Sequence, residues 1–355
     1  MARFILSLME LGVSATVHLL FGFYVFSTAV AADISQAAAA SGCLLLRRPA
    51  AAGAGLVNVA AAGEEEEERR GAAPVVLDGS PPPIVLVHGI FGFGKGRLGG
   101  LSYFAGAEKK DDRVLVPDLG SLTSIHDRAR ELFYYLKGGQ VDYGEQHSKL
   151  CGHARFGMTY DKGYYPVWDE QNPVHFVGHS AGVQVVRVLH QMLAEKAFPG
   201  HDTSEGWILS LTSLSGALNG TTRTYYDGML AEDGRSMKYI CLLQLCRIGV
   251  IIYDWLDIPW LKNYYNFGFD HFEMSWRKQG FSEHPNHFVV DDSDCHPLQP
   301  GIWYYKIIEA DHILFIVNRE RAGVQFDLLY DGIFQRCRKH AFRKSTPTVP
   351  NETSQ

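Results

Sequence analysis

A serine between two glycines, where a strand-like pattern meets a helix-like pattern, constrains the fold of this chain most. The stretch VHFVGHSAGVQVVRVLH (residues 174–190) leads from a short apolar run into Gly178-His179-Ser180-Ala181-Gly182. Apolar residues then recur with helical spacing from Val183 to Leu193. A sharp turn at this junction strains the backbone at the serine and exposes its hydroxyl. The pattern therefore indicates a nucleophile, and the alternative is a serine that only caps a helix.

This junction predicts an α/β-hydrolase fold, with a mostly parallel sheet and helices on both faces. The helix expected over 124–136 has Ser124 as its N-cap and two glycines after its end, and a last helix is expected over 324–337. Buried parallel strands are expected at the runs PIVLVHG, RVLVPDLG, VHFVG, GWILSLTSLSG and GIWYYKIIEADH. With 355 residues, 46% of them hydrophobic, the chain can bury the core of one large domain.

The regions flanking this domain differ from it in composition. Residues 1–33 are largely apolar after Arg3 and long enough to cross a membrane, so we expect an N-terminal transmembrane anchor; a cleaved signal peptide is the alternative. Residues 34–80 are rich in Ala, Gly, Pro and Glu and predict a disordered linker. The hydrolase domain then covers 81–343, and a disordered tail covers 344–355. Arg3 ahead of the span favours an endomembrane location with the domain in the lumen.

The charge pattern bears on partners. The formal net charge is −6 and the chain has no long basic stretch, which argues against nucleic acid as the main partner. The six cysteines are scattered and show no zinc-finger spacing, so they do not decide the compartment. The anchor predicts a membrane as a partner.

Two further features supply other parts of an acyl-transfer site. The glycine-rich loop HGIFGFGKG (residues 88–96) follows the first strand, so the amides of Ile90 and Ala181 are candidates for the oxyanion hole. His312 stands at the end of the last predicted strand, and the order serine then histidine is that of the hydrolase fold. We therefore predict His312 as the general base; a packed structural histidine is the alternative.

A separate cluster combines Asp127, His147 and His153 in one local stretch of sequence. Zinc accepts imidazole nitrogen and carboxylate oxygen ligands, so these residues could hold a metal ion. On the residues alone the two histidines could equally be loop residues that bond to the backbone.

Three blocks of sequence carry a family resemblance: PIVLVHGIFGFG, HDRARELFYYLKGGQVDYGEQHSKLCGHARFGMTY and GHSAGVQ. They resemble the thermostable bacterial lipases of thermophilic bacilli and staphylococci, and the resemblance is closest to the membrane-anchored plant relatives of those enzymes. It covers most of 83–343. It implies a triacylglycerol lipase that acts on an acylglycerol or another lipid ester. In that family pattern Ser180 is the nucleophile, His312 is the base, and the amides of Ile90 and Ala181 form the oxyanion hole.

The resemblance also implies a structural zinc ion, because Asp127, His147 and His153 match three ligands of the family's site. Asp270, in FGFDHFEMSW, matches the fourth less closely. The family's calcium site is not expected here, since Leu314 and Arg319 stand where the family has acidic ligands.

The chain departs from the family where the catalytic acid should lie. The family carries it in an Asn-Asp-Gly segment, and no such segment stands between Asp270 and His312. The nearby Asp291, Asp292 and Asp294 are more typical of turns, so no residue is assigned as the acid. This chain then resembles a shortened form of a lipase. The alternative function is a catalytically impaired, zinc-stabilised, lipase-like protein with a lipid-binding or scaffold role.

One apolar stretch remains, SMKYICLLQLCRIGVIIYDWLDIPWL (residues 236–261). It is apolar on nearly all sides, which is typical of a buried helix. The alternative is a mobile cover over a lipid-binding cleft.

Overall fold

The computed structural model describes residues 80–95, 101–121, 123–216, 312–317 and 319–339, together with individual positions between 218 and 310. The predicted anchor (1–33), nearly all of the predicted linker (34–80) and the predicted tail (344–355) lie outside these residues. Within the described part of the chain, no helix combines the length and the apolar character needed to cross a membrane.

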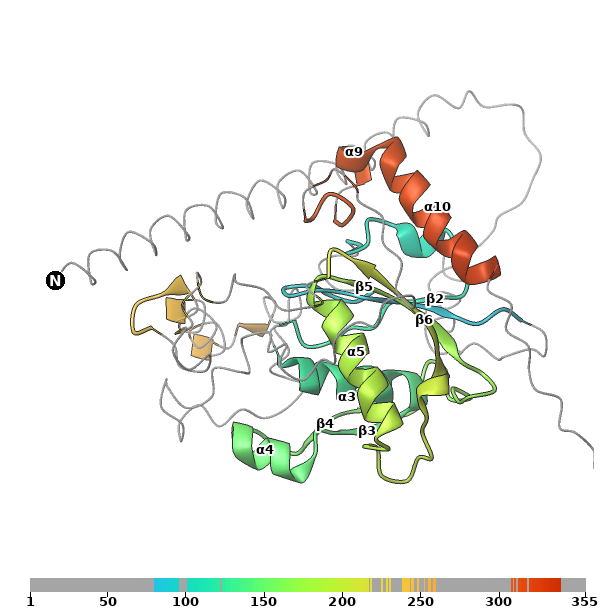
Figure 1. Ribbon diagram of the computed structural model, residues 1–355. Coiled ribbons are helices and arrows are strands. Elements are labelled where there is room, and N and C mark those ends of the chain that lie inside the picture. The colour runs from blue at the N-terminus through green and yellow to red at the C-terminus, as the bar shows by residue number, and fades with distance from the viewer. Residues whose placement is uncertain are drawn as a thin grey trace, which may run out of the picture.

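The centre of the molecule is a four-stranded parallel sheet in the order β2-β1-β5-β6 (Figure 1). Each of these strands coincides with a run that the sequence predicts as a strand, and β5 extends one residue beyond its run. The bounds are Ile84–Val87 (β1), Val114–Leu115 (β2), Val174–His179 (β5) and Ile208–Leu214 (β6). β1 and β5 are buried along their whole length, as expected of central parallel strands. The strand expected at GIWYYKIIEADH lies largely outside the described residues.

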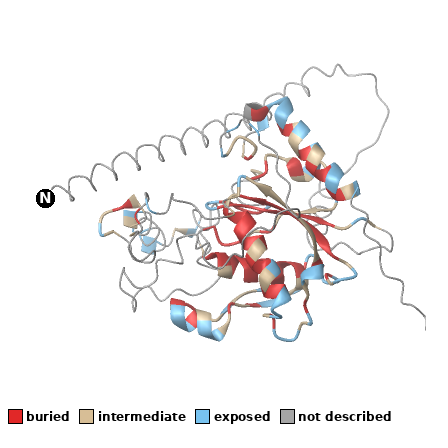
Figure 2. Cartoon of the chain, in the orientation of Figure 1, coloured by how far each residue is buried: buried red, intermediate tan, exposed pale blue. Residues whose placement is uncertain are grey.

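Helices cover both faces of this sheet, which confirms the predicted α/β architecture (Figure 1). Because side chains alternate along a strand, Val85 and Val87 of β1 face one core and Ile84 and Leu86 face the other. The first core is closed by α3 (Ile125–Lys137) and α5 (Ala181–Ala194), and the second by α10 (Val324–Lys339). Figure 2 shows the buried residues concentrated where these helices meet the sheet.

The helix ends follow the signals read from the sequence. Ser124 caps α3, because its Oγ accepts a hydrogen bond from the amide of Asp127 at 3.1 Å. Gly138 ends the same helix with a φ of 89°, a conformation that disfavours residues with a side chain. α10 begins at Val324 as expected and extends to Lys339, two residues further than predicted.

Ion pairs attach α10 to the edge of the sheet. Arg338 donates to both carboxylate oxygens of Asp111, at 2.5 and 2.6 Å. Lys110 lies 2.6 Å from Asp327 and 2.7 Å from Asp331. These contacts fix the helix that follows the loop of His312 and the four-residue helix α9 (Arg319–Ala322).

A second, two-stranded sheet was not predicted from the sequence. β3 (Gly139–Asp142) and β4 (Phe156–Tyr160) pair in antiparallel fashion and enclose the short helix α4 (Glu145–Cys151). Both strands are short and mostly solvent-accessible, so the apolar runs that reveal the central strands are missing. Short helical turns η2 (Ala107–Lys109) and η3 (Glu205–Trp207) complete the named elements.

The apolar stretch 236–261 is only partly described. Six of its large apolar side chains are exposed: Tyr239, Leu245, Ile248, Ile252, Trp255 and Leu256. Cys241 is buried. The expectation of a buried helix is therefore wrong for those six residues. A stretch that is apolar on all sides does not by itself say what covers it.

Candidate active site

Ser180 occupies the turn between β5 and α5. Its φ of 55° and ψ of −126° lie in a region that residues with a side chain rarely adopt. The side chain of Ser180 makes no capping hydrogen bond to α5, so the helix-cap alternative does not describe this residue. A strained, half-buried serine at a strand-to-helix turn is the geometry of a nucleophile elbow.

The two glycines of the motif allow the chain to pass very close to itself. A Cβ on Gly182 would lie 2.2 Å from the carbonyl oxygen of Val87 in β1. A Cβ on Gly178 would lie 2.8 Å from the Cα of Val183. Since real Cβ atoms do not approach backbone this closely, both positions require glycine, and the elbow depends on that close packing.

His312 is distant from Ser180 in the sequence but contacts it in the structure. Its Nε2 lies 2.8 Å from Oγ of Ser180, although 132 residues separate the two in the sequence. This distance is within the range for direct proton transfer between a hydroxyl and an imidazole. His312 is exposed, so an incoming substrate can reach the pair.

The loop of His312 is attached to the domain through its backbone. The phenol of Tyr330 in α10 donates to the carbonyl oxygen of Phe315 at 3.0 Å. The amide of Val317 donates to the carbonyl oxygen of Tyr103 at 2.8 Å. The carbonyl oxygen of His312 itself lies 2.8 Å from Nε2 of His179, the residue before the serine. Burial lowers the pKa of His179 to about 4, which keeps that imidazole neutral near neutral pH.

The loop after β1 presents the amide of Ile90 beside the elbow. The buried guanidinium of Arg128 donates to the carbonyl oxygens of His88 and Gly89, at 2.5 and 3.3 Å. Nδ1 of His88 lies 3.0 Å from the same Gly89 oxygen. In a trans peptide the N–H points opposite to the C=O, so the amide of Ile90 faces away from Arg128. Gly89 meanwhile lies against Ser180, since a Cβ on Gly89 would be 2.9 Å from that of Ser180.

Ala181 is the second predicted donor of the oxyanion hole. It is the first residue of α5, and the first amides of a helix have no partner within the helix. A helix N-terminus also favours negative charge. The structure thus brings together Ser180, His312 and the backbone of both Ile90 and Ala181.

Three of the four predicted metal ligands also come together, at the first turn of α3. Asp127 lies in the first turn of α3 and its side chain is fully buried, His147 lies on α4 and His153 follows α4. Nε2 of His147 lies 3.0 Å from Oδ1 of Asp127, and Nε2 of His153 lies 3.7 Å from the same oxygen. Ligand atoms of a tetrahedral zinc ion are about 3.3 Å apart, so these two distances are of the size that a zinc site requires. Asp270 lies outside the described residues.

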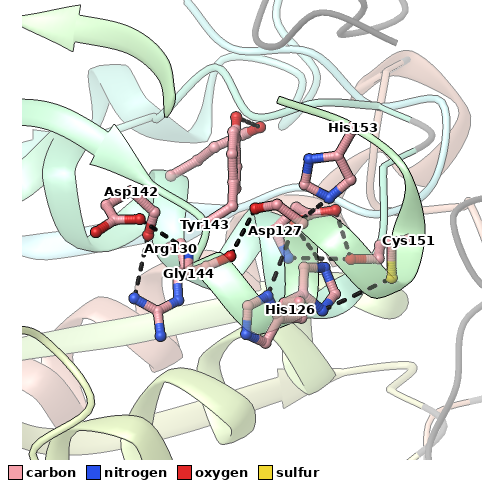
Figure 3. A network of polar contacts seen from close by, with 12 residues as sticks. His126, Asp127, Arg130, Asp142, Tyr143, Gly144, Cys151 and His153 are labelled. Carbon is pink, nitrogen blue, oxygen red and sulfur yellow. Dashed lines mark hydrogen bonds and ion pairs between the residues drawn. The ribbon is translucent and has the colours of Figure 1, made fainter. Parts of the chain in front are cut away.

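His126 is a donor that the sequence analysis missed. Its Nδ1 lies 3.6 Å from Oδ1 of Asp127, and its ring stacks on that of His147 at 3.8 Å. Among the described residues, His126, Asp127 and His147 form a group that could hold a metal ion. Figure 3 shows the labelled His126 and His153 directed toward Asp127. Burial lowers the pKa of His126, which favours the neutral form that a metal requires. Its position next to Asp127 in the sequence was the available signal.

Comparison with known proteins points to lipases. A family model of lipase-like C-terminal domains matches residues 81–199. The lipase of Staphylococcus hyicus is 34% identical over 214 residues, which cover 56% of this chain and 32% of that protein. Lipase 1 of Staphylococcus aureus (strain MRSA252) is 36% identical over 163 residues, which cover 39% of this chain and 24% of that protein. The chain thus spans about a third or less of the length of these curated relatives.

The crystal structure of Staphylococcus hyicus lipase is 31% identical in sequence, and the match covers 56% of this chain and 54% of that chain with a TM-score of 0.38. These sequence similarities agree with the resemblance to bacterial lipases that the motifs predict. These relatives are bacterial, and the closer resemblance to plant proteins stays a prediction.

Proposed function

We propose that this chain is a membrane-anchored carboxylic ester hydrolase of the triacylglycerol lipase type. The observation that carries the proposal is the 2.8 Å contact between Nε2 of His312 and Oγ of Ser180. The strained elbow and the orientation of the Gly89–Ile90 peptide support it, because nucleophile, base and oxyanion donors then surround one point. The substrate class, an acylglycerol or another lipid ester, follows from the similarity to lipases.

The proposed mechanism proceeds through an acyl-enzyme. Oγ of Ser180 attacks the ester carbonyl carbon while Nε2 of His312 accepts the hydroxyl proton. The amides of Ile90 and Ala181 hold the oxyanion that forms. The C–O bond to the alcohol then breaks, and His312 returns the proton to the leaving oxygen. Water, activated by His312 in the same way, hydrolyses the acyl-enzyme and releases the fatty acid.

We also propose that the domain holds a structural zinc ion. Asp127, His147 and His153 would bind it together with Asp270, and His126 lies close enough to contact the same site. Zinc would join the start of α3 to α4 and the chain that follows it. The convergence of three imidazole nitrogens on one buried carboxylate oxygen supports this assignment, because a cation there would balance the charge of Asp127.

Membrane attachment through residues 1–33 is a proposal that the apolar composition of this stretch supports. An anchored enzyme would work on lipid esters at a membrane surface, with its domain in the lumen of an endomembrane compartment. The exposed apolar side chains of 236–261 support a lipid-facing role, as the cover alternative requires.

The experiment that tests the function is hydrolysis of tributyrin by the purified full chain, with Ser180→Ala as control. We expect turnover that falls to background in Ser180→Ala and in His312→Ala. Folding of each variant is checked by circular dichroism. A folded chain without Ser180-dependent turnover would instead support the catalytically impaired, lipid-binding alternative.

A further inference from the structure

Two buried side chains connect the oxyanion loop to the residue that supplies the base. The amide of Gly89 donates to the phenol oxygen of Tyr103 at 3.1 Å, and this oxygen lies 2.8 Å from Nδ1 of His179. On the other side of the ring, Nε2 of His179 lies 2.8 Å from the carbonyl oxygen of His312. Tyr103 and His179 are nearly inaccessible to solvent, at 5% and 3% exposed.

In this series of hydrogen bonds, only one assignment of donors and acceptors is consistent. Since the Tyr103 oxygen accepts from Gly89, its own hydrogen is available for Nδ1 of His179. The proton of neutral His179 then resides on Nε2, which donates to the His312 carbonyl. Burial lowers the pKa of His179 to about 4, which agrees with a neutral ring.

We propose that Tyr103 and His179 are positioning residues that hold the backbone of His312 in place, so that its imidazole reaches Ser180. The inference rests on the proposed function, because it concerns the same proton transfer. It assigns a role to the residue between Gly178 and Ser180, which the elbow itself does not require to be histidine. We call the hydrogen-bonded pair the Tyr103–His179 relay.

The position of His312 explains why such a relay matters. His312 lies in an exposed loop, and a displacement of about 1 Å at a reacting group can cost about 100-fold in rate. Tyr103 holds this loop twice, through the relay at His312 and through its own carbonyl at Val317. The same tyrosine binds Gly89 of the oxyanion loop, so one side chain keeps the base and the oxyanion donors in register.

The test compares substitutions that remove or retain single atoms of the relay, in the full chain. Tyr103→Phe removes only the hydroxyl. His179→Asn retains an amide near Nδ1 and loses the donor to His312, whereas His179→Gln places an amide near Nε2 and retains it. His175→Asn is the matched control, since His175 is a fully buried histidine on the same strand that pairs with Ser210. The readouts are kcat and KM for p-nitrophenyl butyrate and the rate of labelling by a fluorophosphonate.

We expect Tyr103→Phe and His179→Asn to lower kcat and the labelling rate about 10-fold with little change in KM. The kcat of His179→Gln should lie within about 3-fold of the wild-type value. The kcat of His175→Asn should equal the wild-type value. Unchanged kcat in folded Tyr103→Phe would overturn the proposal, as would equal losses in His179→Gln and His179→Asn. If His179→Asn does not fold, Tyr103→Phe alone decides. A wild-type chain that neither labels nor turns over would contradict the proposed function itself.

Discussion

The candidate catalytic site and the candidate metal site are built from different parts of the polypeptide. At the catalytic site, backbone features define most of the geometry: a strained φ at Ser180, two tightly packed glycines and two peptide amides. At the metal site only side chains converge, from α3, from α4 and from the segment after α4. The first site should therefore respond to steric changes, and the second to changes in charge or in bound metal.

The largest expected effect comes from adding one methyl group at the elbow. Gly182→Ala would place a Cβ 2.2 Å from the carbonyl oxygen of Val87, so β1 and α5 must move apart. We expect a loss of about 3 kcal/mol or more in the free energy of unfolding, together with loss of esterase activity. Urea denaturation measures the first quantity.

Gly332→Ala in α10 is the matched control for this substitution. A Cβ at Gly332 would meet no atom within 4 Å, and alanine favours the helix over glycine. The control should therefore gain about 0.5–1 kcal/mol. A Gly182→Ala protein as stable as wild type would show that the close approach of β1 and α5 is not required.

The stability that the metal site contributes should depend on a bound cation, whereas the stability of the elbow should not. Removing zinc with a chelator should lower the free energy of unfolding by about 3 kcal/mol, relative to a sample whose free zinc exceeds its Kd about 200-fold. His147→Ala should behave like the chelated wild type. Metal analysis and thermal melting with and without zinc measure both effects.

Lys149→Ala on the same short helix is the control, because Lys149 is exposed and pairs only at the surface with Glu145. It should retain the zinc content and the melting temperature of wild type. Equal zinc content in wild type and His147→Ala would contradict the assignment of the metal site.

The pH dependence of the free energy of unfolding should report on His179, which lies beside the catalytic serine. The pKa of His179 falls from an ordinary 6.5 to about 4, so between these values the unfolded chain binds the extra proton. Stability therefore rises with pH across this window and is lost as the pH falls. His179 should contribute a loss of about 2 kcal/mol between pH 7 and pH 5.

His179→Gln isolates this contribution, because burial also lowers the pKa values of His126, His190 and His201. The difference between the urea unfolding curves of wild type and variant, measured at each pH, gives the His179 share. If the free energy of unfolding changes with pH by the same amount in both proteins, then His179 is not buried in its neutral form. The neighbours of the His179 ring, Tyr103 and His312, are retained in both proteins.

The sequence predicted the backbone-built site better than the side-chain-built one, for a physical reason. A buried strand, a small residue, a serine and a helix are consecutive in the chain, so local pattern contains the elbow. Ser180 and the first amide of α5 follow from that pattern alone. The reach of His312 to Ser180 depends on how distant segments pack, and only its place after the last strand signalled it.

The metal site and its surroundings show what pattern leaves out. His126 was missed because its proximity to His147 comes from packing α4 against the start of α3. The small sheet of β3 and β4, which carries α4 to that position, has no apolar alternation to reveal it. Likewise the Tyr103–His179 contact joins residues 76 positions apart, and neither residue stands in a recognisable motif for it.

The smallest predicted effect distinguishes a ligand from a supporting residue at the metal site. His126 stacks on His147 and approaches Asp127, so His126→Ala should loosen two ligands without removing one. Loss of such a supporting contact typically weakens metal binding 10- to 100-fold, and we expect about 10-fold here with one zinc per chain retained. Competition with a coloured chelator measures the affinity. If His126→Ala instead loses its zinc outright, as we predict for His147→Ala, then His126 is itself a ligand. All ligands of the site could then come from one continuous stretch of the chain, residues 126–153.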